Sequence, residues 1–264
     1  MTIKKVIDHL GRSVEFSYPP KRIISIAPGL TDTFYSLNLT NEIIGRTRYC
    51  LHPKDKVQQS TRVGGTKDIN LDKIRSLNPD IIFAEKEENT REIVEQLEKE
   101  FPVYVAEVQS VENTYKMIAD LGELTNRSFE AEQLLATIQT GFQNLPIYQH
   151  KKVAYVIWRK PYMVAGKNTY IDSLLQTMGF ENAFSHYEGR YPSVTEEDLK
   201  NAELDYLFLA TEPFPFQEKH LSEFSQFLPE VKPIILDGEM FWYGPRMVDA
   251  ASYFKRKFAE IEDH

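Results

Sequence analysis

The sequence predicts an α/β protein built from two similar lobes, and three observations support this fold class. Short apolar runs typical of strands alternate with segments typical of helices along the whole chain. Strands that are separated by helices pair in parallel and carry the helices on their sheet faces. The order of elements in the first half returns in the second half, and no Gly/Ser-rich linker divides the halves.

The first half begins with the β-branched run RIISIA at 22–27, which ends at Pro28-Gly29. Turn residues such as Asn78-Pro79-Asp80 separate the later elements. The expected strands are residues 22–27, 81–84 and 103–105. The expected helices are residues 30–39, 68–77 and 88–100.

The second half repeats this order, with a strand at 152–158 and a helix at 169–180. The stretch 194–210 then mirrors 69–84, with Asp205 placed like Asp80 and Leu199 like Ile74. The run after Pro233 likewise mirrors the run after Pro102. Agreement in order as well as composition favours two related α/β units, whereas the alternative is a chance echo between α/β segments.

Two helical segments, at 110–124 and 128–145, lie between the halves. At 1.5 Å per residue the second is about 25 Å long. We therefore expect an N-terminal α/β lobe over 1–126, a connecting backbone helix over 127–146 and a C-terminal α/β lobe over 147–264. A stiff helix would hold a cleft lined by loops from the carboxyl ends of the strands, where small ligands bind.

Composition argues against several classes of protein. The net charge of −8 and the pI near 5.4 argue against nucleic acid, which requires clustered Lys and Arg. No run approaches the roughly 20 apolar residues that span a bilayer. Cys50 is the only cysteine, so no internal disulfide forms. The N-terminus lacks an apolar leader region, so we expect a periplasmic or membrane-anchored address if a leader was removed, and a cytoplasmic one otherwise.

The residues 238–246, GEMFWYGPR, place three consecutive aromatics in a loop between two glycines, before a predicted last helix. Flat rings in a loop offer rigid area to a large planar or amphipathic ligand. Arg246 suits a carboxylate or phosphate of the ligand, but pairing with Glu239 across the loop is favoured.

Several segments together resemble the helical-backbone substrate-binding proteins of ABC importers, the group that receives cobalamin, ferric siderophores and haem. They are RIISIAPGLTDTFYSLNL, RVGGTKDINLDKIRSLNPDIIFA, KPYMVAGKNTYIDSLLQTMGFENAF, YPSVTEEDL and the final YGPR. The resemblance covers nearly the whole chain, and cobalamin-binding members look most similar. It implies two α/β lobes joined by one long helix, with the ligand between the lobes.

The resemblance also implies which residues face the ligand. On this sequence they are Pro28, Gly29, Tyr49, His52, Gly65, Thr66, Lys67, Trp158, Tyr162, Tyr191, Phe241, Trp242 and Tyr243. Gly64-Gly65-Thr66 and Glu85 stand where the cobalamin-binding members carry tryptophans, which implies a more polar wall that includes Glu85. Cys50-x-His52 has the composition of an axial metal ligand pair, but a hydrogen-bonding loop histidine is the favoured interpretation.

The same resemblance implies docking on a permease dimer with its ATPase through one acid on each lobe. Glu88 or Glu92 on the first lobe and Glu212 on the second are the candidates. At a helix start, acids such as Glu88 are alternatively explained by the helix dipole. We expect a monomer that takes a metal chelate as its ligand and has no cofactor or metal of its own.

Two other function classes stay open at this point. A two-lobed α/β cleft also suits a metal-tetrapyrrole enzyme, but no G-x-S-x-G, H-E-x-x-H or dinucleotide fingerprint is present. A cytoplasmic relative that stores or senses a cofactor is the other alternative. The sequence favours a binding protein rather than an enzyme.

Overall fold

The computed structural model describes residues 2–262, with side chains over 2–260. The outermost residues of the two predicted lobes, 1 and 263–264, lie outside this range. The chain divides into two compact units. Unit 1 comprises the residues up to Val108 together with Glu112–Gln139, and unit 2 comprises Gln109–Val111 together with the residues from Thr140 onward.

Unit 1 is built on a sheet of five parallel strands in the order β5-β4-β3-β6-β7. The strands are β3 (Ile23–Ser25), β4 (Ile43–Arg46), β5 (Thr61–Arg62), β6 (Ile81–Glu85) and β7 (Val103–Ala106). Residues of β3, β6 and β7 are buried throughout, as expected for strands with helices on both faces.

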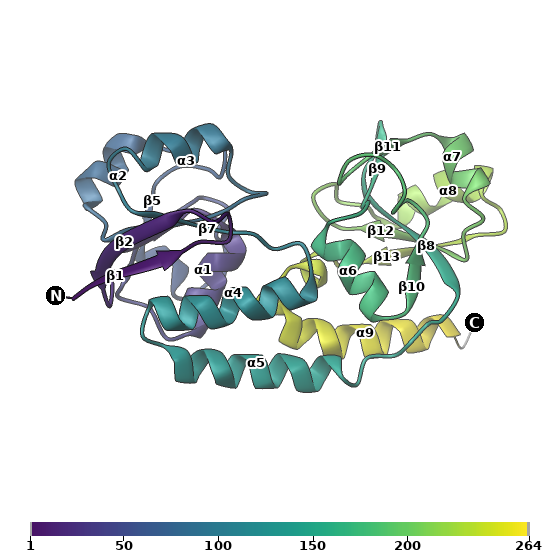
Figure 1. Ribbon diagram of the computed structural model, residues 1–264. Helices are drawn as coiled ribbons and strands as arrows, with labels where there is room; N and C mark the ends of the chain where they lie inside the picture. The colour runs from purple at the N-terminus through teal and green to yellow at the C-terminus, as the bar shows by residue number, and fades with distance from the viewer. Residues whose placement is uncertain (1, 263–264) are drawn as a thin grey trace. The chain divides into compact units, whose positions relative to one another are not determined.

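Helices cover both faces of this sheet (Figure 1). They are α1 (Pro28–Ser36), α2 (Leu71–Leu77) and α3 (Arg91–Leu97), with α4 (Val111–Leu124) following β7 and η1 (Val57–Gln59) preceding β5. Ile74 of α2 and Leu97 of α3 pack with Ile82 on one face. On the other face the ring of Phe34 in α1 lies 4.8 Å from that of Phe83.

An antiparallel hairpin at the start of the chain, β1 (Thr2–Ile7) and β2 (Ser13–Tyr18), was not predicted. Its alternation gives little signal, because Ile3 and Ile7 are exposed while Val14 and Phe16 are buried. The predicted helix at 128–145 is present as α5 (Ser128–Phe142).

Unit 2 has a six-stranded mixed sheet in the order β11-β9-β8-β12-β13, with β10 pairing the start of β8. The strands are β8 (Lys151–Trp158), β9 (Tyr162–Val164), β10 (Phe180–Asn182), β11 (Ser193–Val194), β12 (Tyr206–Ala210) and β13 (Lys232–Leu236). The central strands β8, β12 and β13 are parallel, whereas β9 returns antiparallel to the end of β8.

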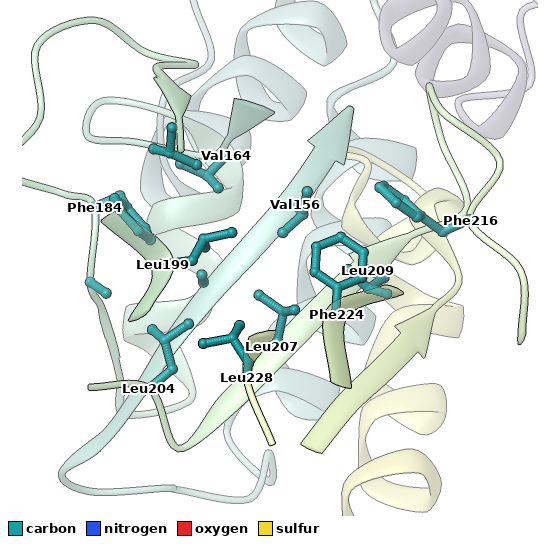
Figure 2. Close-up of a cluster of buried hydrophobic side chains, with 13 residues drawn as sticks. Val156, Val164, Phe184, Leu199, Leu204, Leu207, Leu209, Phe216, Phe224 and Leu228 are labelled. Atoms are coloured by element: carbon teal, nitrogen blue, oxygen red, sulfur yellow. The ribbon is translucent and has the colours of Figure 1, made fainter. Parts of the chain in front are cut away.

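The helices of unit 2 are α6 (Tyr170–Thr177), α7 (Glu196–Asn201), α8 (Leu221–Phe227) and α9 (Arg246–Glu262), with short turns η2 (Glu218–His220) and η3 (Gly238–Phe241). Figure 2 shows the core on one face of the sheet, where Val156, Leu207 and Leu209 meet Phe216 and Phe224. The predicted helix at 169–180 is too long: Gly179 has a φ of +78°, which ends the helix, and Phe180 starts β10.

The predicted internal repeat is confirmed by matching hydrogen bonds. The Asp80 carboxylate accepts the backbone N–H groups of Lys21 and Arg22 (2.7 and 2.9 Å), just before β3. The Asp205 carboxylate accepts the backbone N–H of Lys152 (2.7 Å), at the start of β8. Each aspartate thus ties the strand that it precedes to the first parallel strand of its own unit. The fold class, two α/β units, is as predicted.

Candidate functional site

In unit 1 the predicted ligand-facing residues follow the carboxyl ends of parallel strands, which lie at one edge of the sheet. Pro28 and Gly29 form the first turn of α1, and Gly29 is buried there. Tyr49 and His52 follow β4, and the GGT segment follows β5. Neighbouring strands therefore bring these loops to the same edge of the unit.

The GGT segment is shaped by close packing. Gly64 has a φ of +125°, and a Cβ there would lie 2.4 Å from the Asp68 carbonyl oxygen. A Cβ at Gly65 would lie 2.2 Å from Oδ1 of Asp68, whose carboxylate pairs with the guanidinium of Arg48 at 2.8 and 2.9 Å. Gly65 and Thr66 are buried, and only Lys67 exposes its side chain. Gly65 and Thr66 are thus packing residues, in contrast to their predicted ligand-facing role.

In the loop after β4, Cys50 of the Cys50-x-His52 motif is buried, whereas His52 is half-buried. The thiol of Cys50 is buried, 3.1 Å from Oγ1 of Thr31 and 3.2 Å from Oγ1 of Thr47, and burial raises its pKa. Tyr49 is 49% exposed, with the guanidinium of Arg48 5.0 Å from its ring. Within residues 2–260 no group of three or more Cys, His, Asp or Glu side chains is placed to hold a metal ion.

Glu85, predicted to face the ligand, points into unit 1 instead. Its side chain is buried, and its carboxylate accepts backbone N–H groups of Glu87 (2.8 Å), Glu88 (3.0 Å) and Val108 (3.2 Å). Burial raises the pKa of Glu85 to about 7. The sequence does not reveal this, because the three donors lie in two loops that only the fold brings together.

The two docking candidates of unit 1 differ in exposure. Glu88 is half-buried, and burial followed by the charge of Glu87 raises its pKa, while the nearby charge of Lys67 opposes the shift. Glu92 is exposed in the first turn of α3, where hydrogen bonds from its own backbone N–H and from Thr90 lower its pKa. Of these two carboxylates, that of Glu92 is the more exposed.

In unit 2 the loop after β13 is anchored by polar contacts at its start. Asp237 caps η3 by accepting the backbone N–H of Glu239 at 3.0 Å. The backbone N–H of Gly238 donates to Oγ1 of Thr211, after β12, at 2.9 Å. The ring of Phe241 is buried, 4.3 Å from Tyr155 and 5.1 Å from Phe254. Phe241 is therefore a core residue rather than the ligand-facing residue that was predicted.

The other two aromatics of this loop are half-buried. The side chain of Trp242 lies next to Glu212 and acts to lower the pKa of that carboxyl. The ring of Tyr243 lies 6.2 Å from that of Tyr170. Burial, followed by the charges of Glu239 and Asp237, raises the pKa of Glu212. Glu212 thus packs against the loop, whereas an exposed docking acid was predicted. Nη2 of Arg246 lies 3.8 Å from the carboxylate of Glu239, which is the favoured pairing.

The remaining predicted residues of unit 2 lie at the end of β8 and beyond. Trp158 is 40% exposed and meets the ring of Phe214 edge-on at 5.8 Å. The hydroxyl of Tyr162 donates to Glu223, and its ring packs on Phe224. Tyr191 is half-buried. Tyr162 accordingly has a structural role in unit 2, while its half-buried ring leaves the predicted ligand contact a prediction.

Two surface depressions lie away from these loops. One of about 380 Å³ is lined by Gln149, Gln176 and Glu181 among others, and one of about 490 Å³ by Arg12, Glu98 and Lys99 among others. Both include residues near the amino ends of strands, opposite the loops described above. Neither is lined by a residue that was predicted to face the ligand. Among the described residues, no helix has the length and apolar character needed to cross a membrane.

Comparison with known proteins decides the class. A family model described as "Periplasmic binding protein" matches residues 23–231. The chain belongs to the periplasmic binding protein family. This confirms the resemblance and the fold class inferred from the sequence.

Individual relatives found by sequence similarity are also binding proteins. An ABC transporter substrate-binding lipoprotein of Bacillus subtilis, YvrC, described as uncharacterized, is 27% identical over 205 residues, covering 73% of this chain and 64% of its own length. The vitamin B12-binding protein of Vibrio vulnificus is 25% identical over 189 residues, 69% of this chain and 68% of that protein. The chain thus spans slightly under two thirds of the Bacillus relative.

Among solved structures, a possible iron-binding (periplasmic solute-binding) protein from Staphylococcus epidermidis superposes with a TM-score of 0.75 at 22% identity, covering 91% of this chain and 99% of that one. This likeness shows the fold. These matches are all to binding proteins, and they support neither the enzymatic nor the cytoplasmic alternative.

Proposed function

We propose that this chain is the substrate-binding component of an ABC importer. It takes up a metal chelate of the cobalamin, ferric-siderophore or haem type and delivers it to a permease dimer with its ATPase. The protein works outside the cytoplasm, as a monomer, and has no cofactor of its own. Membership of the family and the relatives that bind vitamin B12 support the ligand class.

The observation that carries this proposal is the anchored aromatic loop of unit 2. Phe241 is held in the core between Tyr155 and Phe254, and this fixes Trp242 and Tyr243 at the carboxyl edge of the sheet. Rigid aromatic area binds a macrocycle with little loss of side-chain entropy.

The ligand-facing set is therefore narrower than the sequence suggested. In unit 1 it keeps Pro28, Tyr49, His52 and Lys67. In unit 2 it keeps Trp158, Tyr191, Trp242 and Tyr243, whereas Arg246 is assigned to its pair with Glu239. For permease docking in unit 1 we retain Glu92, because its carboxylate is exposed. Exposed charges of this kind steer encounter between partners more than they add affinity.

Titration of tryptophan fluorescence tests the ligand class. Cyanocobalamin, haemin and a ferric hydroxamate are each added to the wild-type protein and to the Trp158→Phe and Trp242→Phe variants. Trp158 and Trp242 are the only tryptophans, so each variant reports on the other ring. We expect saturable quenching at one ligand per chain by one of the three compounds. Absence of saturable quenching by all three contradicts the proposed ligand class.

The docking role needs a separate measurement in cells. Glu92→Lys is expected to lower uptake of the ligand while its Kd for the isolated protein stays unchanged. Glu95→Lys, also exposed on α3, is the matched control for an added positive charge. Equal uptake by wild type and Glu92→Lys would remove Glu92 from the docking surface.

A further inference from the structure

Two buried side chains connect the loops at the carboxyl edge of the unit 1 sheet. They are Asn89 and Glu85, which are 4% and 1% exposed. Glu85 is the last residue of β6, the strand that pairs with β3 on one side and β7 on the other, and Asn89 lies in the loop that follows it. Together they bond to the loops after β3, β5, β6 and β7, and we call them the Asn89 brace.

Asn89 uses its whole side-chain amide for this purpose. Its Nδ2 donates to the carbonyl oxygen of Ile26, after β3, at 3.0 Å and to that of Thr66, after β5, at 2.9 Å. Its Oδ1 accepts the backbone N–H of Glu85 at 3.0 Å. An amide is the side chain that supplies two donors and an acceptor from one planar group.

Glu85 extends the brace to the remaining loop. One carboxylate oxygen accepts the backbone N–H groups of Glu87 and Glu88, after β6, and the other accepts that of Val108, after β7. The loop after β3 leads into Pro28, and the loop after β5 carries Lys67. The brace therefore fixes the backbone from which proposed ligand contacts project, without reaching the surface itself.

We propose that Asn89 is a positioning residue for ligand binding: by donating to the Ile26 and Thr66 carbonyls and accepting from Glu85, it sets the spacing of the ligand-facing loops of unit 1. Its effect on affinity rests on the proposed function. Its effect on the loops does not, because every hydrogen bond of the brace is made between residues of unit 1.

Two substitutions separate this role from simple packing. Asn89→Ala removes all three side-chain hydrogen bonds and leaves buried carbonyl groups without a donor. Asn89→Asp keeps the shape and the acceptor but places a carboxylate against two carbonyl oxygens. When that carboxylate is protonated it regains one O–H donor. Asn89→Asp therefore recovers part of the brace as the pH falls, and Asn89→Ala does not.

The matched control is Ile74→Val, which removes one methyl group from a fully buried side chain of α2 in the same unit. It lowers stability through the core without touching the brace. Asn89→Asp is isosteric, so it carries the test if Asn89→Ala does not fold.

The first measurement is hydrogen exchange of the ligand-free proteins at pH 7.5. We expect faster exchange in residues 26–29, 64–68 and 86–89 of both Asn89 variants. The amides of β7 and of residues 81–84 in β6 should exchange as they do in Ile74→Val, whereas the Glu85 amide, which donates to Asn89, should exchange faster in Asn89→Ala. Unchanged exchange in the three loops, or faster exchange spread evenly over unit 1, overturns the proposal.

The second measurement is the Kd for whichever of cyanocobalamin, haemin and ferric hydroxamate the wild type binds. Both Asn89 variants are expected to weaken binding about ten-fold or more at pH 7.5, as the loss of buried hydrogen bonds implies. Glu85 titrates in the same pH range, so each variant is compared with wild type at the same pH, and Asn89→Ala is the reference for that titration. The loss for Asn89→Asp should shrink towards pH 5 by more than the loss for Asn89→Ala. Wild-type affinity in both variants overturns the positioning role.

A wild-type protein that binds none of the three compounds overturns the proposed function and, with it, the role of Asn89 in binding. The hydrogen-exchange result then still decides whether the brace sets the loops. The two failures are therefore distinguishable.

Discussion

The hydroxyl of Tyr162 donates a hydrogen bond of 2.5 Å to Oε1 of Glu223, the same carboxylate that the guanidinium of Arg159 holds in an ion pair. The pKa of Glu223 is lowered, chiefly by its hydrogen bond from Arg159. Burial acts in the opposite direction, and the hydrogen bond from Tyr162 lowers the pKa further. The three side chains join the β8–β9 hairpin to α8. A tyrosine that the sequence placed on the ligand is thus part of the internal structure of unit 2.

Tyr162→Phe is accordingly expected to lower the free energy of unfolding by about 1.5–3 kcal/mol, the range for a hydrogen bond to a charged group. Ligand affinity should not change, because the hydroxyl is already bonded within the unit. Urea denaturation and chelate titration measure the two quantities. Weakened binding with unaltered stability would return Tyr162 to the ligand-facing set.

The repeated aspartates predict matched losses of stability. Asp80→Asn and Asp205→Asn each weaken hydrogen bonds to backbone N–H groups at the start of the first parallel strand, at a cost of about 1–3 kcal/mol. Burial acts to raise the pKa of Asp205. Hydrogen bonds from the backbone N–H of Lys152 and the ammonium of Lys151 outweigh burial, so the pKa of Asp205 is lowered. Stability from Asp205 is therefore present above its unfolded-state pKa and lost as the pH falls through the folded-state value.

Thermal unfolding of Asp205→Asn and wild type from pH 7 down to pH 3 measures this effect. The difference between them should be constant near neutral pH and should shrink below about pH 4, the unfolded-state value of an aspartate. A difference that does not depend on pH would show that the charge of Asp205 contributes nothing.

Glu85 has the opposite dependence on pH. Burial raises its pKa to about 7 from 4.5, so the folded chain holds this proton more tightly than the unfolded chain. Its contribution to stability is full below the unfolded-state pKa and is lost as the pH rises through about 7. We expect Glu85→Gln to flatten the fall in stability between pH 5 and pH 7.5, as measured by urea denaturation. An unchanged slope would contradict the raised pKa.

Gly64→Ala tests the close packing in the GGT segment. The added Cβ would lie 2.4 Å from the Asp68 carbonyl oxygen, at a φ of +125°. Gly11→Ala is the control, because Gly11 has a φ of +77° and no heavy atom within 4 Å of the added Cβ. Backbone strain alone costs about 1–3 kcal/mol, so Gly64→Ala should lower stability by more than Gly11→Ala. Equal losses in denaturation would show that the loop relaxes.

Much of the fold was readable from local pattern. The strands β6 and β12 are short apolar runs, and parallel strands covered on both faces are apolar along their whole length. Asp80 and Asp205 were recognised as equivalent because their neighbours recur in the same order. The β1–β2 hairpin was missed because Ile3 and Ile7 are exposed, which inverts the expected pattern.

The candidate site was only partly readable, because exposure depends on contacts made far along the chain. The sequence located the aromatic loop, but Tyr155 and Phe254 decide that Phe241, and not Trp242, enters the core. In the same way Glu85 lies next to a charged run, and its burial depends on the distant N–H of Val108. Nothing in the sequence indicated that Asn89 connects the loops, because both groups that accept its hydrogen bonds are backbone carbonyls.

Because Cys50 is buried, cysteines introduced elsewhere in the chain can be labelled selectively. Its thiol is the only one in the sequence, lies against Thr31 and Thr47, and has a pKa raised by burial, which keeps the reactive thiolate scarce. Cysteines introduced at exposed sites, such as Glu95 in unit 1 and Lys200 in unit 2, would be the ones that a maleimide dye reaches. Energy transfer between two such dyes would report how the distance between the units responds to each chelate, with the native cysteine left in place.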